Sequence, residues 1–266
     1  MQPNPIITFT SDFGSREYYV GSVKGAILSA CPSANIVDLS HSVASHDLLE
    51  GAFTLLCSYS CFPPRTIHLV VVDPGVGSER KSILVVTENY YFIGPDNGVL
   101  SLVYEKEEVS RVISIEAEHH FRQPVSPTFH ARDILGPVAG NLARGFQPDK
   151  FGPEIKEFTR LTLPAPRKVS EGRLEGIVLH VDKFGNLITN LSPPAAAHLM
   201  GRQVSPAEFQ LGDRKVSCHV EYYAQAPQSE LVSLVGSSGF YEIAALKKPA
   251  ARLLNAHRGT KVRMMV

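Results

Sequence analysis

The chain has 266 residues, of which 44% are hydrophobic and 20% are charged. This is enough apolar sequence to bury a sizeable core, and enough length for two domains. Lys plus Arg and Asp plus Glu number 26 each, so no net field draws the protein to nucleic acid or to an anionic membrane.

Cysteine spacing and the N-terminal residues indicate in which cellular compartment the protein works. The cysteines lack the spacing of a zinc site, and Cys57 and Cys61, four apart in a predicted helix, are expected to pack as small apolar side chains. No signal peptide pattern opens the sequence, and no apolar run approaches the roughly 20 residues that span a bilayer. We expect a cytoplasmic protein with reduced cysteines, no bound metal, and no membrane or nucleic-acid partner.

Strand-like and helix-like segments alternate through the first half of the chain. The segment 20–30, for example, places apolar residues at Val20, Val23 and Ile27, the spacing of an amphipathic helix. The alternation predicts an N-terminal doubly wound, Rossmann-like α/β domain. The predicted strands are 6–10, 35–39, 66–72, 82–87 and 90–93, and the predicted helices are 20–30, 47–61 and 134–143.

The second half has a different pattern. Pro153, Pro164 and Pro166 interrupt any helix between residues 151 and 169, so we place the domain boundary there, with domains 1–160 and 161–266. Short strands separated by turns then predict a smaller C-terminal β-barrel or sandwich. These predicted strands are 174–181, 208–211, 215–221, 231–235, 240–244 and 261–265.

Asp73 and Arg80 flank a loop that directly follows the apolar run 67–72, which is typical of a buried strand. Pro74 and the glycines of this loop make continuation as strand or helix unfavourable, so the loop is a place to present side chains. An ordinary Asp-Pro-Gly turn with a solvated arginine is the alternative.

Two further polar residues stand at element ends. His130 precedes the predicted helix 134–143, and a helix N-terminus favours the neutral form of the ring, although a purely structural histidine is the alternative. Asp12 follows the first predicted strand as Asp73 follows the third, at the strand ends where such sheets bind ligands. Asp12 could instead cap the next helix.

Five motifs in order resemble the S-adenosylmethionine (SAM) hydroxide adenosyltransferases, kin of fluorinase and chlorinase, over nearly the whole chain. The resemblance implies attack of water or hydroxide on the ribose C5′ of SAM, giving adenosine and methionine without a cofactor. The motifs are Ser11-Asp12-Phe13-Gly14, Val72-Asp73-Pro74-Gly75-Val76-Gly77 with Arg80, Phe129-His130-Ala131-Arg132-Asp133, Asp182-Lys183-Phe184-Gly185-Asn186 and Gly236-Ser237-Ser238-Gly239.

The resemblance assigns catalysis to Asp73, Arg80 and His130. The leaving group is a neutral thioether that needs no general acid, so the difficulty lies in activating water. Asp73 and His130 can accept a water proton, directly or in relay, and Arg80 can stabilise the developing hydroxide.

Substrate contacts are implied in the same way. Asp12 matches the carboxylate that holds the ribose hydroxyls, a bidentate acceptor for a diol. An Asp-x-x-Gly-Asn turn between strands is the alternative explanation of residues 182–186. The remaining implied contacts are Asp182 with the methionine ammonium, Asn186 with the adenine edge, Phe184 beside the base, Ser237 with the methionine carboxylate, and Tyr223, or Tyr222 one position earlier, as a second aromatic wall.

The resemblance also implies a homotrimer whose sites lie between the first domain of one subunit and the second domain of its neighbour. Hydroxide transfer is favoured over the halide transfer of a chlorinase-like enzyme, because Asp73 replaces a tyrosine and its carboxylate would repel halide. Arg80 has no counterpart in the halogenating kin, and Ala131 aligns with their halide-binding serine. A non-catalytic SAM or adenosine binding protein is the other alternative; it would need none of the three catalytic residues.

Overall fold

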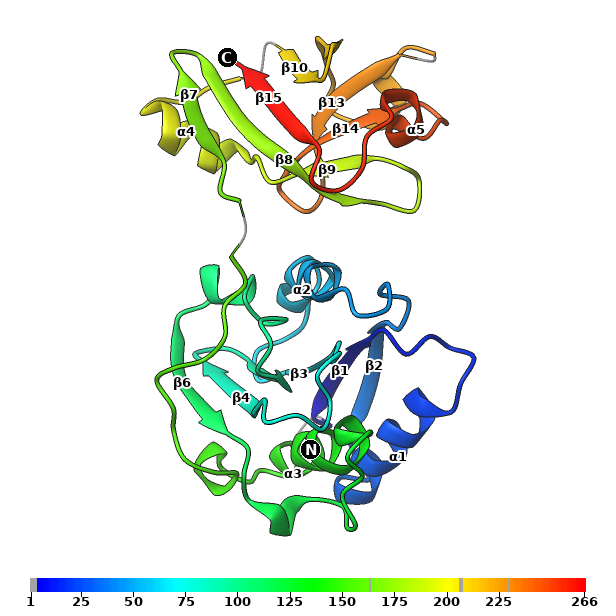
Figure 1. Cartoon of the computed structure of the whole chain (residues 1–266), viewed down its shortest axis with the longest axis vertical. Coiled ribbons are helices and arrows are strands. Elements are labelled where there is room, and N and C mark those ends of the chain that lie inside the picture. The colour runs from blue at the N-terminus through cyan, green and yellow to red at the C-terminus, as the bar shows by residue number, and fades with distance from the viewer. Residues whose placement is uncertain (1–3, 163, 206–207, 229) are drawn as a thin grey trace. The chain divides into compact units, whose positions relative to one another are not determined.

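The computed structural model describes residues 4–162, 164–205, 208–228 and 230–266. The chain divides into two compact units, Met1–Leu161 and Thr162–Val266, which Figure 1 shows in blue to green and in green to red. None of the helices in the described ranges is both long and apolar enough to cross a membrane.

The first unit contains a six-stranded sheet with the strand order β2-β1-β3-β5-β4-β6. β1, β2, β3 and β5 are parallel, whereas β4 runs antiparallel to its neighbours β5 and β6. The mixed α/β prediction is therefore confirmed, with an antiparallel strand inside the sheet. The strands are β1 (Ile6–Ser11), β2 (Asn35–Ser40), β3 (Ile67–Val71), β4 (Ser82–Thr87), β5 (Tyr91–Pro95) and β6 (Val109–Ser114), and the last was not predicted.

Helices cover both faces of this sheet because the side chains of β3 alternate between two cores. Leu69 and Val71 pack in the core formed with α1 and α3, whereas Val70 and Val72 pack in the core that includes Leu55 of α2. The helices are α1 (Tyr19–Ala30), α2 (Leu48–Leu56) and α3 (Gly136–Ala143), with the shorter turns η2 (Val103–Glu105), η3 (Glu118–His120) and η5 (Pro148–Lys150).

The predicted helix 47–61 is too long. The Ser58 hydroxyl donates to the carbonyls of Thr54 and Leu55, at 2.7 and 3.2 Å, and such side-chain bonds compete with helix continuation. α2 therefore ends at Leu56, and a separate turn, η1 (Tyr59–Cys61), follows. Cys57 and Cys61 are both exposed, so the prediction that they pack as apolar residues is wrong.

The second unit is a strongly curved sheet with the strand path β11-β10-β15-β8-β9-β14-β13-β12, and β7 pairs with β8. β11 and β12 stand at opposite ends of the path although Ser217 alone separates them, so the sheet is nearly closed and barrel-like. The predicted strand 215–221 is thus two strands. The strands are β7 (Arg167–Ser170), β8 (Arg173–Val181), β9 (Leu187–Thr189), β10 (Glu208–Leu211), β11 (Arg214–Val216), β12 (Cys218–His219), β13 (Leu231–Val235), β14 (Tyr241–Ala245) and β15 (Lys261–Met265).

Two helices were not predicted in this unit, α4 (Pro193–Met200) and α5 (Ala250–Leu254). Ser192 caps the N-terminus of α4, since its side chain accepts a hydrogen bond from the Ala195 N–H, and Gly201 in the left-handed conformation caps the C-terminus. Its Ala196 and Met200 join the barrel core around Phe209.

Candidate active site

The loop after β3 folds back on itself and pairs Asp73 with Arg80. The Val76 N–H donates to the Asp73 carbonyl at 3.3 Å, which turns the chain. Arg80 Nε then donates to Asp73 Oδ1 at 2.8 Å, and Arg80 Nη2 donates to Oδ2. The two side chains are only 6% and 10% exposed, so Arg80 is not a solvated turn residue. A bidentate pair of this kind fixes both groups in one geometry.

His130 joins this pair through Arg80. Arg80 Nη2 lies 3.2 Å from His130 Nδ1, and because a guanidinium can only donate, Nδ1 must accept and the proton of the neutral ring resides on Nε2. Burial, and then the charge of Arg80, lower the pKa of His130 below its ordinary value. The structure therefore brings the three predicted catalytic residues together in one cluster, which we call the Asp73–Arg80–His130 cluster.

Gly77 explains how two loops far apart in sequence meet. Its φ of +82° lies in the left-handed region, and a Cβ at this position would lie 2.2 Å from the Pro127 carbonyl oxygen. Only glycine allows this approach. The Asp73 loop consequently rests directly on the segment that leads into His130.

Asp133 anchors that segment; the sequence placed it in a motif but assigned it no role. Its carboxylate is fully buried and accepts two hydrogen bonds of 2.7 Å from Arg132, one from Arg122 and one from the Ser126 N–H. These bonds hold the pKa of the Asp133 carboxyl below its ordinary value, against the opposing effect of burial. His130 immediately precedes a single π-helical turn, η4 (Ala131–Leu135), a geometry frequent at functional sites.

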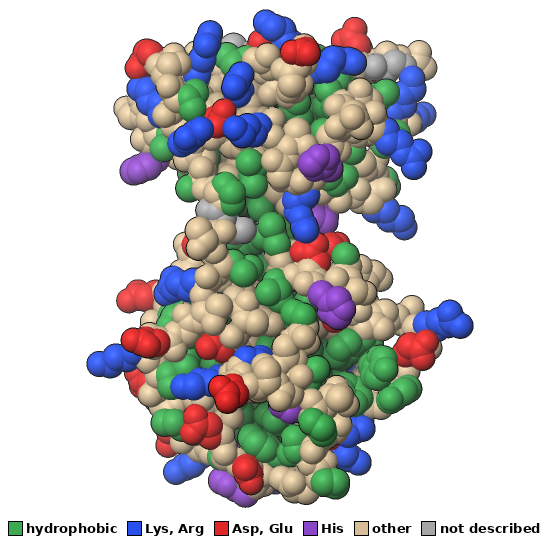
Figure 2. All heavy atoms as spheres, in the orientation of Figure 1, with side chains coloured by type: hydrophobic (Ala, Val, Ile, Leu, Met, Phe, Trp, Pro, Cys, Tyr) green, Lys and Arg blue, Asp and Glu red, His purple; other side chains and the backbone are tan. Residues whose placement is uncertain are grey.

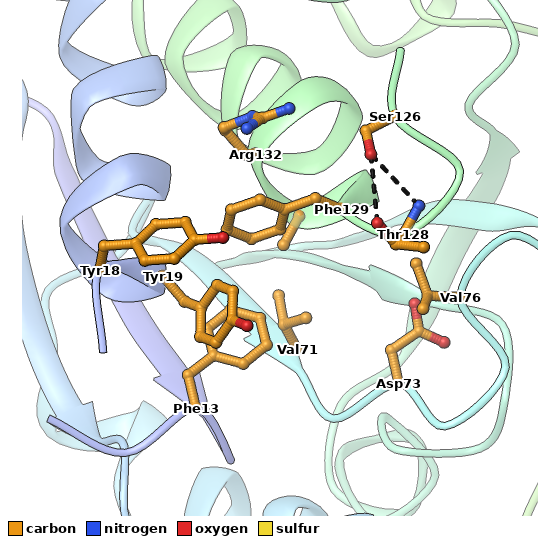
Figure 3. A pocket seen from close by; sticks show the side chains of 11 residues that line it. Phe13, Tyr18, Tyr19, Val71, Asp73, Val76, Ser126, Thr128, Phe129 and Arg132 are labelled. Atoms are coloured by element: carbon orange, nitrogen blue, oxygen red, sulfur yellow. Dashed lines mark hydrogen bonds between the residues drawn. The ribbon is translucent and has the colours of Figure 1, made fainter. Parts of the chain in front are cut away.

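A pocket of about 290 Å³ opens beside this cluster in the first unit (Figure 3). Asp73 lines it, so the carboxylate faces a space large enough for part of a small molecule. Aromatic rings form one side, and short side chains including Val76 and Thr128 form the other. The rings belong to Phe13, Tyr18, Tyr19 and Phe129.

Asp12 lies at the same edge of the sheet. β1 and β3 are adjacent and parallel, with Ser11 opposite Val71, so Asp12 and Asp73 both follow the carboxyl ends of their strands. Asp12 Oδ2 accepts a hydrogen bond of 2.9 Å from the His46 N–H, whereas the N-cap residue of α1 is Tyr18 and no side chain caps this helix. The alternative that Asp12 caps the helix is therefore wrong.

The predicted contacts of the second unit begin with a tight turn. Asp182 Oδ1 accepts from the N–H groups of Phe184 and Asn186, at 2.9 and 2.8 Å, and Oδ2 accepts from Asn186 Nδ2 at 2.9 Å. The Asp-x-x-Gly-Asn turn is thus present. It buries Asn186 and presents Phe184, which is 75% exposed.

Tyr223 and Ser237 lie near a buried acid that the sequence did not single out. The Tyr223 hydroxyl donates to Glu242 Oε2 at 2.6 Å, and a Cβ at Gly236 would lie 1.7 Å from Glu242 Oε1. Burial, opposed by this bond, raises the pKa of the Glu242 carboxyl. Ser237 is exposed on the turn that Glu242 packs against, and Tyr222 is exposed as well.

These features define a class of protein. A carboxylate, a guanidinium and a neutral imidazole are joined by hydrogen bonds at the carboxyl ends of parallel strands, next to a pocket. This is the arrangement of an enzyme active site for a small molecule on an α/β sheet.

Comparison with known families is more specific. The model of the SAM hydroxide adenosyltransferase N-terminal domain matches residues 7–152, and that of the C-terminal domain matches residues 176–263. The chain belongs to the SAM hydroxide adenosyltransferase family, and the resemblance inferred from its five motifs is confirmed.

Similar individual proteins are consistent with this family. A protein of Methanocaldococcus jannaschii named (R)-S-adenosyl-L-methionine hydrolase is 35% identical over 94% of this chain and 92% of its own. A Thermus thermophilus protein of the same name is 31% identical over 97% and 99%. An Actinoplanes fluorinase is 31% identical over 71% and 72%. The crystal structure of an uncharacterized conserved protein from Thermotoga maritima matches with a TM-score of 0.90 at 32% identity, over 98% of this chain and 100% of that one.

Proposed function

We propose that this protein hydrolyses SAM to adenosine and L-methionine by attack of water on the ribose C5′. The observation that carries the proposal is the Asp73–Arg80–His130 cluster beside a pocket, in a chain that is similar to SAM hydrolases over 94% and 97% of its length. Because the names of these relatives specify the R configuration, we propose the R epimer at sulfur as the preferred substrate.

The geometry supports a division of roles within the cluster. His130 Nδ1 is engaged by Arg80, so its Nε2–H is a donor that can hold one lone pair of the attacking water. Asp73 retains lone pairs on both oxygens beside the Arg80 bonds and takes the water proton as the second lone pair attacks C5′. The C5′–S bond breaks, its electrons return to sulfur, and the thioether of methionine leaves without an acid.

The substrate contacts complete the proposal. Asp12 holds the ribose diol with the oxygen lone pairs that its bond to the His46 N–H leaves free. Asp182 attracts the methionine ammonium by its charge, because its own hydrogen bonds come from neutral N–H groups. Asn186 meets the adenine edge, Phe184 and Tyr223 flank the base, and Ser237 meets the methionine carboxylate.

We further propose that a homotrimer builds each site from the first unit of one copy and the second unit of its neighbour. Charge supports this assembly: residues 1–161 contain 13 Lys and Arg against 18 Asp and Glu, a net −5, whereas residues 162–266 contain 13 against 8, a net +5. Figure 2 shows Lys and Arg side chains gathered over the second unit. Opposite net charges favour the encounter of unlike units.

Product analysis tests the activity. Pure protein is incubated with the separated R and S epimers of SAM, with and without chloride, and the products are separated by chromatography. Adenosine and methionine in equal amounts, formed faster from the R epimer, are expected. A 5′-chloro-nucleoside formed in the presence of chloride would show that the activity is halide transfer and not hydrolysis. Saturable binding of SAM without any product would show a non-catalytic binding protein.

Complementation tests the assembly. Asp73→Asn and Asn186→Ala proteins are each expected to be nearly inactive, and mixing them should restore part of the activity, since a mixed trimer contains a composite site with both native residues. Subunit exchange is verified by native mass spectrometry of labelled chains. Exchange without rescue would contradict a site shared between subunits.

A further inference from the structure

We propose that Phe13, Tyr18, Tyr19 and Phe129 form an aromatic cage that binds the sulfonium group of the substrate and selects it over neutral thioether nucleosides. This inference rests on the proposed function and concerns the same site. It assigns a specificity role to four side chains beyond the predicted catalytic and binding residues.

The four rings come from two segments and surround one side of the pocket in Figure 3. Tyr19 lies 5.4 Å from Phe129 between ring centroids, nearly perpendicular to it, and Phe13 lies 6.1 Å from Phe129 with the same edge-to-face arrangement. Tyr18 and Tyr19 lie 4.6 Å apart. Rings held at these angles present both faces and edges to the cavity.

Charge in the pocket is already balanced without a ligand. Among the residues that line it, Asp73 is paired with Arg80, and Arg132 is paired with Asp133. The faces of the aromatic rings therefore supply the negative potential that a bound cation would meet. Phe129 already uses one face in this way, because the Arg132 guanidinium carbon lies 4.9 Å from its centroid.

A sulfonium suits such a cage. Its charge is spread over sulfur and the attached carbons, it has no N–H to satisfy, and it is comparable to the quaternary ammonium groups that aromatic cages recognise. In Figure 3 Tyr18 and Tyr19 lie on one side of the pocket and Asp73 on the other. This is the order that in-line displacement requires, with the leaving sulfur and the attacking water on opposite sides of C5′.

The effect on kinetics follows from the chemistry. The positive charge on sulfur disappears as the C5′–S bond breaks, so the rings stabilise the bound substrate more than the transition state. Loss of a ring should therefore raise KM while kcat stays the same or rises. A merely structural role would not give this pattern.

The test compares a cationic and a neutral ligand on the same variants. KM for SAM and Ki for S-adenosylhomocysteine, a neutral thioether competitor, are measured for wild type, Tyr19→Leu and Tyr18→Leu. Tyr19→Phe keeps the ring, and Phe146→Leu removes an exposed aromatic of the same unit outside the pocket. We expect KM to rise about 3- to 30-fold in the two leucine variants, with Ki changed less than KM and both controls near wild type.

Equal weakening of SAM and S-adenosylhomocysteine would overturn the cage, because apolar packing alone would explain it. A second probe does not depend on turnover: trimethylsulfonium methylsulfate is titrated into the full-length protein and followed by NMR. Saturable binding lost in Tyr19→Leu but kept in Phe146→Leu supports the cage, and no binding to wild type overturns it. Absence of adenosine from wild type would refute the proposed function, while the trimethylsulfonium result would still decide the cage.

Discussion

Gly77→Ala tests whether the contact between two loops controls catalysis. An alanine Cβ would lie 2.2 Å from the Pro127 carbonyl oxygen, whereas real Cβ contacts are essentially never shorter than 3.0 Å. The two loops must therefore separate by about 0.8 Å or more. Asp73 and His130 sit on these loops, and a displacement of about 1 Å in an active site can reduce the rate about 10²-fold. We expect kcat to fall by about this factor.

The expected loss of stability is smaller and separable. A left-handed alanine costs about 1–2 kcal/mol, and the loops are at the surface, where they can move apart. Gly145→Ala is the matched control: Gly145 has a φ of +100°, but no atom lies within 4 Å of the added Cβ. Gly75→Ala is a second control within the Asp73 loop, where the nearest contact is an ordinary 3.4 Å.

Steady-state kinetics and thermal unfolding of the three variants separate an effect on kcat from an effect on stability. We expect Gly77→Ala and Gly145→Ala to lose comparable stability, and Gly77→Ala alone to lose kcat. If Gly77→Ala kept the kcat of Gly145→Ala while remaining folded, the loop contact would have no role in aligning the Asp73–Arg80–His130 cluster.

Three further expectations concern titratable groups. Asp73→Asn should lower kcat by about 10²–10⁴-fold with little change in KM, and adding His130→Ala should cost less than the product of the two single effects, as measured by steady-state assays. Burial and Arg80 lower the pKa of His130, so its ring should titrate by NMR below the ordinary value of about 6.5. The value of kcat/KM should stay constant as pH falls through about 6.5 and should decline only at lower pH. Titration of His130 at or above about 6.5 would refute the assignment of a neutral ring held by Arg80. Burial lowers the pKa of His68 to about 3, so the unfolded state alone binds this proton between about pH 6.5 and pH 3, and stability is lost as pH falls through that window. By pH 5 this should remove about 2 kcal/mol of the free energy of unfolding relative to pH 7. Denaturant titrations at several pH values measure this loss, and the free energy of unfolding of His68→Leu should change less between pH 7 and pH 5 than that of the wild type.

Much of the first unit could be predicted locally. The apolar run 67–72 and the glycines and proline after it determine a buried strand followed by a loop, because side-chain alternation and turn chemistry act over a few neighbouring residues. The same holds for β15, predicted and found at residues 261–265. The end of α2 was harder to predict, because the Ser58 hydroxyl competes with backbone N–H groups for the helix carbonyls and the helix stops before Cys57.

Motifs in order established the family, because each motif is a short string that can be matched without knowing the fold. The side-chain contacts within the candidate site could be predicted only in part. Asp182 occupies three acceptor contacts in its own turn, and Tyr223 binds a glutamate nineteen residues further along. The Asp182 contacts are local to the turn at residues 182–186, which the sequence offered as an alternative, whereas the Tyr223–Glu242 contact depends on which strands of the barrel become neighbours.

By itself, then, the sequence determined most of the strands, the loop after β3 and the residues able to accept or donate protons, but it did not predict β6, β7 or β9. Tertiary structure alone decided that Arg80 bridges Asp73 and His130, although Arg80 and His130 are fifty residues apart, and that aromatic rings from two segments form one side of the adjoining pocket. The physical reason is the contact between Gly77 and Pro127: a distance between two loops is set by the order of strands in the sheet and by close packing, and no local pattern contains it.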